Sequence, residues 1–544
     1  MPDTSHNYDF IIVGAGSAGC VLADQLSANG RYQVLLIEAG GSDRRPDIRI
    51  PTGYAFTYSN PAVNWCYQTE PDPGLNNRTA YWPRGKVIGG SSSINAMAYV
   101  RGLAHDFDDW ETAGAAGWGS KTAWETYGQL ERHSELDSTG KRQSRSNGPL
   151  WVSDLSNEIP AFAQRFIAAG EELGYSRLDH INGNRQEGLT LLRSNVYQGK
   201  RWSAADAFLH PALRRPNLRV ISRALVERIT LEGDDLLRAT GIRYQHNGRS
   251  HTAYAQHEVI ISAGAINSPQ LLQLSGIGPE KLLHQHNIPV KHSLEQVGKG
   301  LQDHLAITHY YHATVPTLNN RLGNLPGKAL AALQYLFTRS GPLSIPVNHC
   351  GGFIRADAQS SKPDIQFYAN AASYSIPSSG KAQIDKEPGF LICTQPSRPD
   401  SRGEINIASG NAQDAPLIQA NSLATEQDRS NAIKAGKLLQ QFAATDAMQQ
   451  VIKAAKTPDI SLMNDEELLE NFRERAGTVY HPTSTCRMGN NAQDSVLDNR
   501  LRVHGINGLR VVDASAFPNI TSGNTNAPTM MLALRAAKLI LEDR

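Results

Sequence analysis

Two short segments near the end of the sequence carry the side chains best suited to chemistry. His481 lies in the segment YHPTSTCRMG, and an imidazole readily takes a proton near neutral pH. Asn524 lies in SGNTNAP, and its amide can donate a hydrogen bond to a substrate oxygen without competing for the proton. Both have simpler explanations, because most single histidines pack or lie at the surface and asparagine often caps a helix. The residues alone leave both explanations open.

A glycine-rich turn near the N-terminus predicts a nucleotide-binding element. Residues 10–13 (FIIV) form a β-branched and aromatic run, typical of a strand buried on both faces. Gly14, Gly16 and Gly19 follow in the G-x-G-x-x-G spacing, which permits a tight turn, close approach of a pyrophosphate and close packing of helix on strand. The helix expected from about Ser17 directs its free N–H groups at the phosphates.

An acidic residue completes this nucleotide-binding pattern. Residues 34–37 (VLLI) predict a second buried strand, and Glu38 follows it, nineteen positions after Gly19. A carboxylate at this spacing accepts hydrogen bonds from a ribose diol and repels a 2′-phosphate, which argues against NADP. FAD and NAD remain open, since both contain an ADP half.

Composition sets limits on the class of protein. A chain of 544 residues predicts two domains or two intertwined lobes, and 40% hydrophobic with 19% charged residues is typical of a globular protein. The net charge of +1 gives no reason to expect a nucleic-acid partner. Five scattered cysteines without a C-x-x-C pair predict reduced thiols in the cytoplasm, and no metal site is indicated. No secretion signal or transmembrane run is found, and peripheral membrane association is left open.

Residues 84–97 (RGKVIGGSSSINAM) form a second glycine-rich segment. Its glycines and serines offer backbone and hydroxyl donors with little bulk, so they suit a surface that lies against a flat ring. A flexible loop explains the composition equally well.

Two further expectations are an exposed loop over residues 134–148 and a helix over residues 425–455.

Nine segments together resemble the glucose–methanol–choline (GMC) oxidoreductase family, on its choline-dehydrogenase-like bacterial branch. They run from residue 11 to residue 540: IIVGAGSAGCVLA, LLIEAGG, NWCYQTEP, WPRGKVIGGSSSINAMAYVRG, VIISAGAINSPQLLQLSGIGP, VGKGLQDH, YHPTSTCRMG, LRVHGINGLRVVDASAFP and SGNTNAPTMMLALRAAKLI. The resemblance implies an α/β fold like that of p-hydroxybenzoate hydroxylase. A Rossmann-like FAD-binding domain would carry a discontinuous substrate domain, made of a mixed or antiparallel sheet flanked by helices. The expected FAD-binding parts are residues 1–155, 216–308 and 471–544, and the expected substrate parts are 156–215 and 309–470.

The resemblance also implies the cofactor and its contacts. In the family the dinucleotide is FAD, and relatives that attach it covalently use a histidine where this chain has Ile94, so non-covalent FAD is expected. Val226 would contact the adenine, and Asp513 the pyrophosphate or ribitol. The expected cofactor-binding residues are Gly14, Gly16, Ser17, Ala18, Gly19, Glu38, Ala39, Trp65, Arg84, Val87, Gly89, Gly90, Ser91, Asn95, Ala96, Met97, Val226, Ala263, Gly264, Asp513, Ala514, Asn524 and Thr525.

The implied activity is oxidation of an alcohol, primary and either aliphatic or aryl, to the aldehyde. His481 would be the base above flavin N5, and Asn524 would hold the substrate oxygen. The electron acceptor, quinone-like or O2, is left open. The alternatives are an oxidase that releases H2O2, a choline dehydrogenase and a hydroxynitrile lyase that keeps FAD as a structural part. Choline dehydrogenases carry a glutamate where this chain has His349, and an imidazole is a poor partner for a quaternary ammonium. His349 is therefore expected in the substrate pocket, and the alternative explanation is a histidine that only packs.

Overall fold

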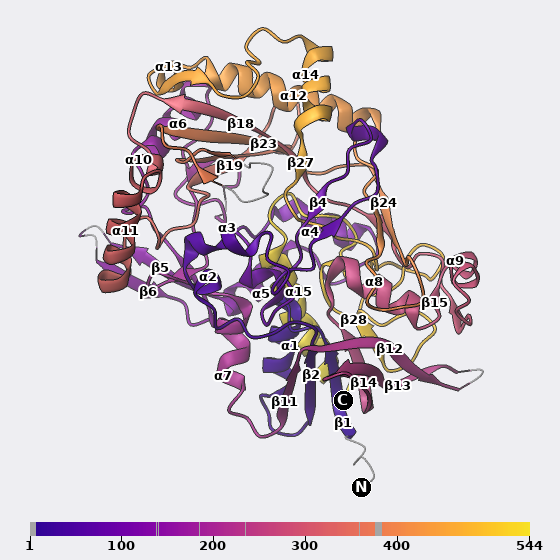
Figure 1. Cartoon of the computed structure of the whole chain (residues 1–544). Helices are drawn as coiled ribbons and strands as arrows, with labels where there is room; N and C mark the ends of the chain where they lie inside the picture. The colour runs from indigo at the N-terminus through magenta and orange to yellow at the C-terminus, as the bar shows by residue number, and fades with distance from the viewer. Residues whose placement is uncertain are drawn as a thin grey trace.

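Two large β-sheets organise the molecule. The computed structural model describes residues 7–137, 139, 141–183, 185–233, 236–357, 359–375 and 383–544. One sheet lies toward the bottom of Figure 1 and contains the N-terminal strand; the other lies toward the top. The chain passes between them several times, so each sheet is built from segments that are distant in the sequence.

The lower sheet is a mainly parallel nucleotide-binding type of sheet. Strand β1 pairs in parallel with β2 on one side and with β14 on the other, which confirms the two strands expected around the glycine turn. Helix α1 (Ser17–Ser27) connects β1 to β2 and packs beside α15 (Asn526–Glu542), the last helix. The sheet order is β11 (Leu218–Ser222), β2 (Val34–Glu38), β1 (Asn7–Val13), β14 (Arg249–Ile261), β13 (Arg238–His246) and β12 (Ala224–Glu232), with β28 (Leu509–Val511) also paired to β14.

The upper sheet is antiparallel. Its order is β26 (Ile452–Ala455), β18 (Leu305–Ala313), β23 (Gly389–Pro396), β20 (Ile365–Asn370), β19 (Cys350–Ile354) and β8 (Gly188–Leu191), with β27 (Gly477–Thr478) also paired to β18. Side chains of β20 alternate between its faces. Phe367 packs with Phe166 and Phe442 in the core under helices α6 (Phe162–Glu172) and α12 (Glu426–Ala443), whereas Gln366 and Tyr368 face a cavity.

Two local expectations are wrong. The helix expected over 425–455 ends at Ala443, and after the short α13 (Asp446–Gln449) the chain continues as β26, because its backbone pairs with β18. The loop expected over 134–148 contains two paired strands, β5 (Glu131–Leu136) and β6 (Arg142–Arg145). All four residues of β6 are exposed, so no hydrophobic alternation revealed the hairpin in the sequence.

The remaining helices surround the two sheets. They are α2 (Pro46–Arg49), α3 (Tyr54–Thr57), α4 (Ala104–Thr112), α5 (Ser120–Leu130), α7 (His210–Ala212), α8 (Gly264–Leu274), α9 (Glu280–Gln285), α10 (Leu318–Leu322), α11 (Leu325–Thr338) and α14 (Asp465–Arg475). Of the helices in the described part of the chain, none has the length and apolar content needed to cross a bilayer.

Candidate active site

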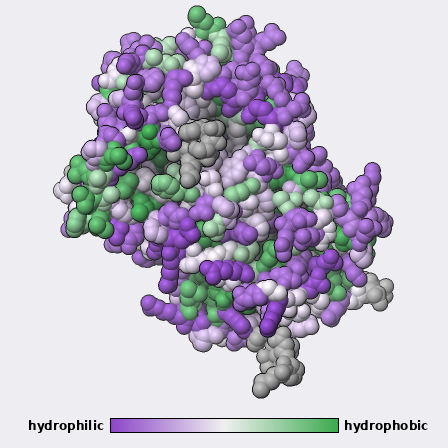
Figure 2. Space-filling view, in the orientation of Figure 1, coloured by the Kyte–Doolittle hydropathy of each residue, from purple (hydrophilic) through white to green (hydrophobic). Residues whose placement is uncertain are grey.

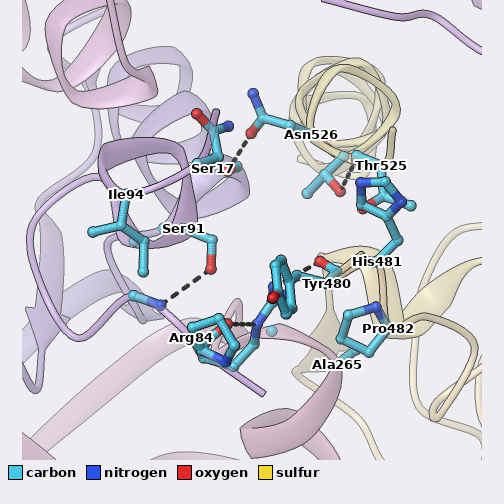
Figure 3. A pocket seen from close by; sticks show the side chains of 18 of the residues that line it. Ser17, Arg84, Ser91, Ile94, Ala265, Tyr480, His481, Pro482, Thr525 and Asn526 are labelled. Carbon is cyan, nitrogen blue, oxygen red and sulfur yellow. Dashed lines mark hydrogen bonds between the residues drawn. The ribbon is translucent and has the colours of Figure 1, made fainter. Parts of the chain in front are cut away.

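A cavity of about 430 Å³ is lined by residues of both sheets. Val13, at the end of β1, and Glu38, at the end of β2, line it from the lower sheet, and Gln366 and Tyr368 line it from β20. Figure 3 shows residues from distant parts of the chain around this space, among them Ser17, Arg84, Ala265, His481 and Thr525. A ligand in this cavity would therefore contact both the carboxyl ends of the parallel strands of the lower sheet and the upper sheet.

The glycine turns form a cradle that lacks side chains. Gly14 has φ +101°, and a Cβ built there would lie 2.5 Å from the carbonyl oxygen of Ser262. Gly90 has φ +53°, and its Cβ would lie 2.6 Å from the Cα of Gly16, so two backbone segments meet with no room for a side chain. Because both turns line the cavity, an elongated ligand can lie against bare backbone at this point.

Two helix N-termini meet at the same cavity. The Ser17 hydroxyl at the start of α1 donates to Oδ1 of Asn526 at the start of α15 over 2.8 Å (Figure 3). Neither helix has an acidic residue in its first turn, so neither neutralises the partial positive charge of its own free N–H groups. The N-cap of α15 is Thr525, which shows that the simpler explanation of Asn524 as the N-cap is wrong.

Two buried carboxylates hold the loops at the nucleotide end. Glu38 accepts hydrogen bonds from the backbone N–H groups of Ala15 (2.9 Å) and Gly40 (2.7 Å), and burial raises its pKa to about 7. Asp513 accepts from the N–H of Gly264 over 2.9 Å, and burial raises its pKa. Each oxygen of Glu38 accepts one of these bonds and has a second lone pair, so this side chain can also accept from ligand hydroxyl groups, whereas Oδ2 of Asp513 also accepts from the Ser268 hydroxyl.

Most of the expected cofactor-binding residues line the cavity, but three do not. Gly19 packs α1 against the turn, since a Cβ there would lie 1.8 Å from the carbonyl oxygen of Gly14. The N–H of Gly89 donates to the carbonyl of Ala15 over 2.7 Å, and Val87 is fully buried. These three residues pack behind the glycine turns and hold them in place.

His349 was expected in the substrate pocket wall, and the structure corrects this. Its ring is buried, its Nδ1 accepts from the N–H of Ala371 over 3.0 Å, and burial lowers its pKa to about 4. The preceding residues Val347 and Asn348 line the cavity in its place. His349 is therefore a neutral packing residue.

His481 is held in place at three points. Its backbone N–H donates to Oδ1 of Asp303 (2.7 Å), its Nδ1 lies 2.9 Å from Nδ1 of His304, and its Nε2 lies 3.1 Å from Nδ2 of Asn524. Burial, with smaller contributions from His304 and Arg84, lowers the pKa of His481 well below its usual range. The imidazole is therefore neutral at neutral pH, and it lines the cavity beside Asn524.

The hydrogen bonds around His481 determine which of its two ring nitrogens carries the proton. Nε2 of His304 lies 2.7 Å from the carbonyl oxygen of Ser397, which can only accept, so Nε2 carries the proton of this neutral ring. Nδ1 of His304 must then accept from Nδ1–H of His481. As a result, Nε2 of His481 carries no proton, and its lone pair accepts from the amide N–H₂ of Asn524. Gln366 Nε2 donates to Oδ1 of Asn524 over 3.2 Å, which turns the amide N–H₂ toward His481.

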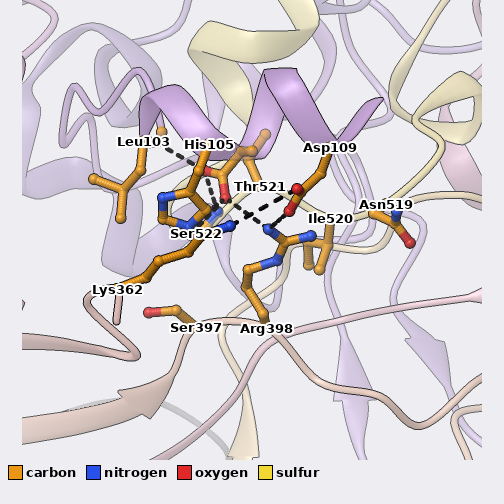
Figure 4. A network of polar contacts seen from close by, with 12 residues as sticks. Leu103, His105, Asp109, Lys362, Ser397, Arg398, Asn519, Ile520, Thr521 and Ser522 are labelled. Carbon is orange, nitrogen blue, oxygen red and sulfur yellow. Dashed lines mark hydrogen bonds and ion pairs between the residues drawn. The ribbon is translucent and has the colours of Figure 1, made fainter. Parts of the chain in front are cut away.

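A polar network fixes the segment that carries Asn524 (Figure 4). The backbone N–H and the hydroxyl of Ser522 donate to the two carboxylate oxygens of Asp106 over 2.8 and 2.6 Å. Arg398 forms an ion pair with Asp109 and lies 3.6 Å from Asp106. Helix α4 thereby anchors the segment before α15.

The wall near His481 and Asn524 combines tyrosines and alkyl side chains with amides such as those of Gln366 and Asn370. The hydroxyl groups of Tyr58 and Tyr480 lie 2.8 Å apart, and Arg84 donates to the carbonyl of Tyr480 over 2.6 Å. The other residues of this kind on the cavity wall include Tyr54, Val347, Tyr368, Tyr374 and Leu391.

Sequence reasoning missed four residues of this site: Asp106, Asp303, His304 and Gln366. Asp303 and His304 lie in the segment VGKGLQDH, which carries part of the family resemblance but shows no partner for either residue.

The cavity extends from the nucleotide-binding sheet to a buried histidine–asparagine pair beside the second sheet. This arrangement defines a flavin-dependent oxidoreductase. The chain belongs to the GMC oxidoreductase family, whose models match residues 8–306 and 399–533. It is 40% identical over 537 residues to an alcohol dehydrogenase [acceptor] from Pseudomonas putida, covering 98% of this chain and 96% of that one.

Two further comparisons agree with this assignment. An oxygen-dependent choline dehydrogenase from Vibrio vulnificus is 40% identical over 544 residues, covering 99% of this chain and 95% of that one. The crystal structure of pyridoxine 4-oxidase from Mesorbium loti matches with a TM-score of 0.86 at 30% identity, covering 97% of this chain and 98% of that one. The chain is thus an enzyme of the kind that oxidises CH–OH groups with FAD.

The cavity fits this cofactor. The side-chain-free cradle at Gly14 and Gly90 leaves room for a pyrophosphate, and the start of α1 provides unpaired N–H groups for it. Glu38 lies where a ribose diol needs an acceptor.

Proposed function

We propose that the enzyme oxidises a neutral primary alcohol, aliphatic or aryl, to the aldehyde, with His481 as the base. The observation that carries this proposal is the unprotonated Nε2 of His481, a state set by the contact of the other ring nitrogen with His304. A neutral, buried imidazole on the cavity wall, with Nε2 unprotonated beside Asn524, can accept a hydroxyl proton.

Asn524 orients the substrate in this proposal. Its amide N–H₂ group faces His481, so an alcohol oxygen that approaches Nε2 also meets a hydrogen-bond donor. The tyrosines and alkyl side chains of the wall would limit the access of water to the reacting carbon once the alcohol is bound. When bound, FAD supplies the acceptor for the hydride that leaves the alcohol carbon.

We infer that FAD is held without a covalent bond. Ile94 lines the cavity in the glycine–serine loop, at the position where relatives that attach FAD carry a histidine. An alkyl side chain cannot supply the nucleophile that such a bond requires.

A neutral alcohol is favoured over choline. The acidic residues on the cavity wall, within the described chain, are Glu38 and Asp513, and both bond to backbone of the nucleotide-binding turns. No carboxylate of the described lining lies among the tyrosines near His481, where a quaternary ammonium would need one. Relatives named for alcohol and for choline are equally similar to this chain, so the names themselves do not decide.

We propose a quinone-like acceptor, and therefore a dehydrogenase; the two relatives at 40% identity are both named dehydrogenases, one with an unspecified acceptor and the other oxygen-dependent. An oxidase of the same fold would release peroxide instead. Measuring peroxide during turnover in air, with and without a quinone analogue, separates the two.

Anaerobic mixing with an alcohol panel tests the proposal. Primary aliphatic or aryl alcohols should bleach the oxidised flavin band, and choline should do so more weakly. The His481→Ala variant should keep FAD but bleach about 10²- to 10⁴-fold more slowly, as expected for loss of a general base. A band that no alcohol bleaches would instead favour a lyase that uses FAD structurally.

A further inference from the structure

Helix α11 (Leu325–Thr338) carries an apolar surface that the active site does not use. Ala331 and Tyr335 are its buried residues and hold it to the body of the protein. Figure 2 shows hydrophobic residues gathered at the left edge of the molecule, where Figure 1 places α11. The apolar face of α11 consists of five side chains that are 53–81% exposed: Leu325, Leu330, Leu333, Leu336 and Phe337.

The helix lies directly outside the wall of the active-site cavity. Ala331 packs in one hydrophobic cluster with Met97, which lines the cavity. The hydroxyl of Tyr335 donates to the carbonyl of Gly199 over 2.8 Å, which fixes the helix to the body. The apolar face is therefore attached to a fixed element, and it is large for the surface of a protein that remains in water.

The charged side chains within and directly beside helices α10 and α11 are basic. Arg321, Lys328 and Arg339 are exposed and form no ion pair within the described residues, and the sequence has no acidic residue between positions 304 and 356. The nearby Asp385 is paired with Lys456, and Glu158 accepts from the N–H of Gly341. The surface around α11 is therefore basic, although the net charge of the whole chain is only +1.

We propose that the apolar face of α11 docks this enzyme onto the surface of an anionic phospholipid bilayer. Apolar side chains surrounded by lysine and arginine match the boundary between acyl chains and anionic headgroups. At 14 residues the helix is about 21 Å long, so it lies in the interface and does not span the ~30 Å hydrocarbon core. A second copy is the weaker candidate occupant, because pairing two such faces would bring their uncompensated cations together.

Vesicle binding of the FAD-loaded enzyme tests this proposal. The wild-type protein should sediment with vesicles that mix phosphatidylcholine and phosphatidylglycerol, and less so at high salt or with phosphatidylcholine alone. The double variant Leu333→Ser/Phe337→Ser should bind roughly 100-fold more weakly. Lys328→Glu should weaken binding to the anionic vesicles and leave the weaker binding to phosphatidylcholine unchanged. The control Leu462→Ser, at a leucine that is 95% exposed and outside the face, should bind like wild type.

Three results would overturn the proposal. The first is that the wild type fails to bind anionic vesicles. The second is that the double variant binds as well as wild type, and the third is that Leu462→Ser loses as much binding as the double variant. A wild-type dimer that the double variant converts to monomer, without vesicle binding by either, would show that a second copy covers this face. Flavin absorbance and oxidation of a water-soluble alcohol should be the same in all variants, since none of the changed residues contacts the cavity.

Discussion

His304 and His481 face each other through their Nδ1 atoms at 2.9 Å, with their ring planes at 90°. The two residues are 177 positions apart in the sequence, and both are buried. Because the carbonyl of Ser397 fixes the proton of His304 on Nε2, this contact sets the tautomer of His481. His304 is a positioning residue, since it acts on the reaction only through His481.

Replacing His304 tests that role. The His304→Leu variant removes the acceptor for His481 Nδ1–H, so we expect alcohol-dependent flavin bleaching to slow about 10- to 100-fold. His304→Asn keeps an acceptor oxygen close to the position of Nδ1 and should retain most of the rate. Stopped-flow absorbance measures both variants. Equal rates in His304→Leu and wild type would show that the contact does not control the base.

Asn524 should affect positioning more than cofactor binding. The Asn524→Leu variant keeps the volume but removes the donor beside His481 Nε2, and we expect about 10- to 100-fold slower bleaching together with a weaker apparent affinity for the alcohol. Gln366→Leu, which loses the bond that turns the amide, should show a smaller effect in the same direction. Single-turnover reduction at several alcohol concentrations separates the two parameters. Unchanged reduction in Asn524→Leu would remove this residue from the site.

The cofactor should leave the protein on denaturation. Because Ile94 offers no atom for a covalent bond, acid precipitation should release all of the FAD into the supernatant. Absorbance of pellet and supernatant measures the split. The Ile94→Val variant, which keeps an alkyl wall, should behave identically. Flavin that remains in the washed wild-type pellet would contradict non-covalent binding.

Local patterns in the sequence predicted the nucleotide-binding elements well. The strand, turn and helix around Gly14 form from consecutive residues, so their spacing alone specifies them. The pairing of His481 with Asn524 spans 43 positions and was expected only from the family resemblance. The contact with His304 depends on how distant segments pack, and nothing in the spacing of these residues indicates it. The short motif around His349 wrongly predicted a residue of the substrate pocket, because the position of a residue next to a fully buried strand does not determine whether it lines a pocket.

Buried histidines should make stability depend on pH. Burial lowers the pKa of His304 to about 4 and that of His309 to about 3, against about 6.5 in an unfolded chain. Between these values the unfolded state binds more protons than the native state, so each such histidine lowers stability as the pH falls below about 6.5, by up to ~1.4 kcal/mol per pH unit. Glu38 and Asp303, whose pKa values burial raises to about 7 and about 6, act in the opposite sense.

A comparison of variants isolates one of these contributions. His309→Gln removes a buried titrating ring outside the cavity, so the fall in Tm between pH 7 and pH 5 should be smaller than in wild type, as the linkage relation requires. His284→Gln changes an exposed histidine of α9 and should leave the fall in Tm as it is. Flavin fluorescence during heating measures Tm, since release of FAD reports unfolding. If His309→Gln shows the same pH dependence as wild type, then the native ring of His309 takes up its proton as readily as in the unfolded chain.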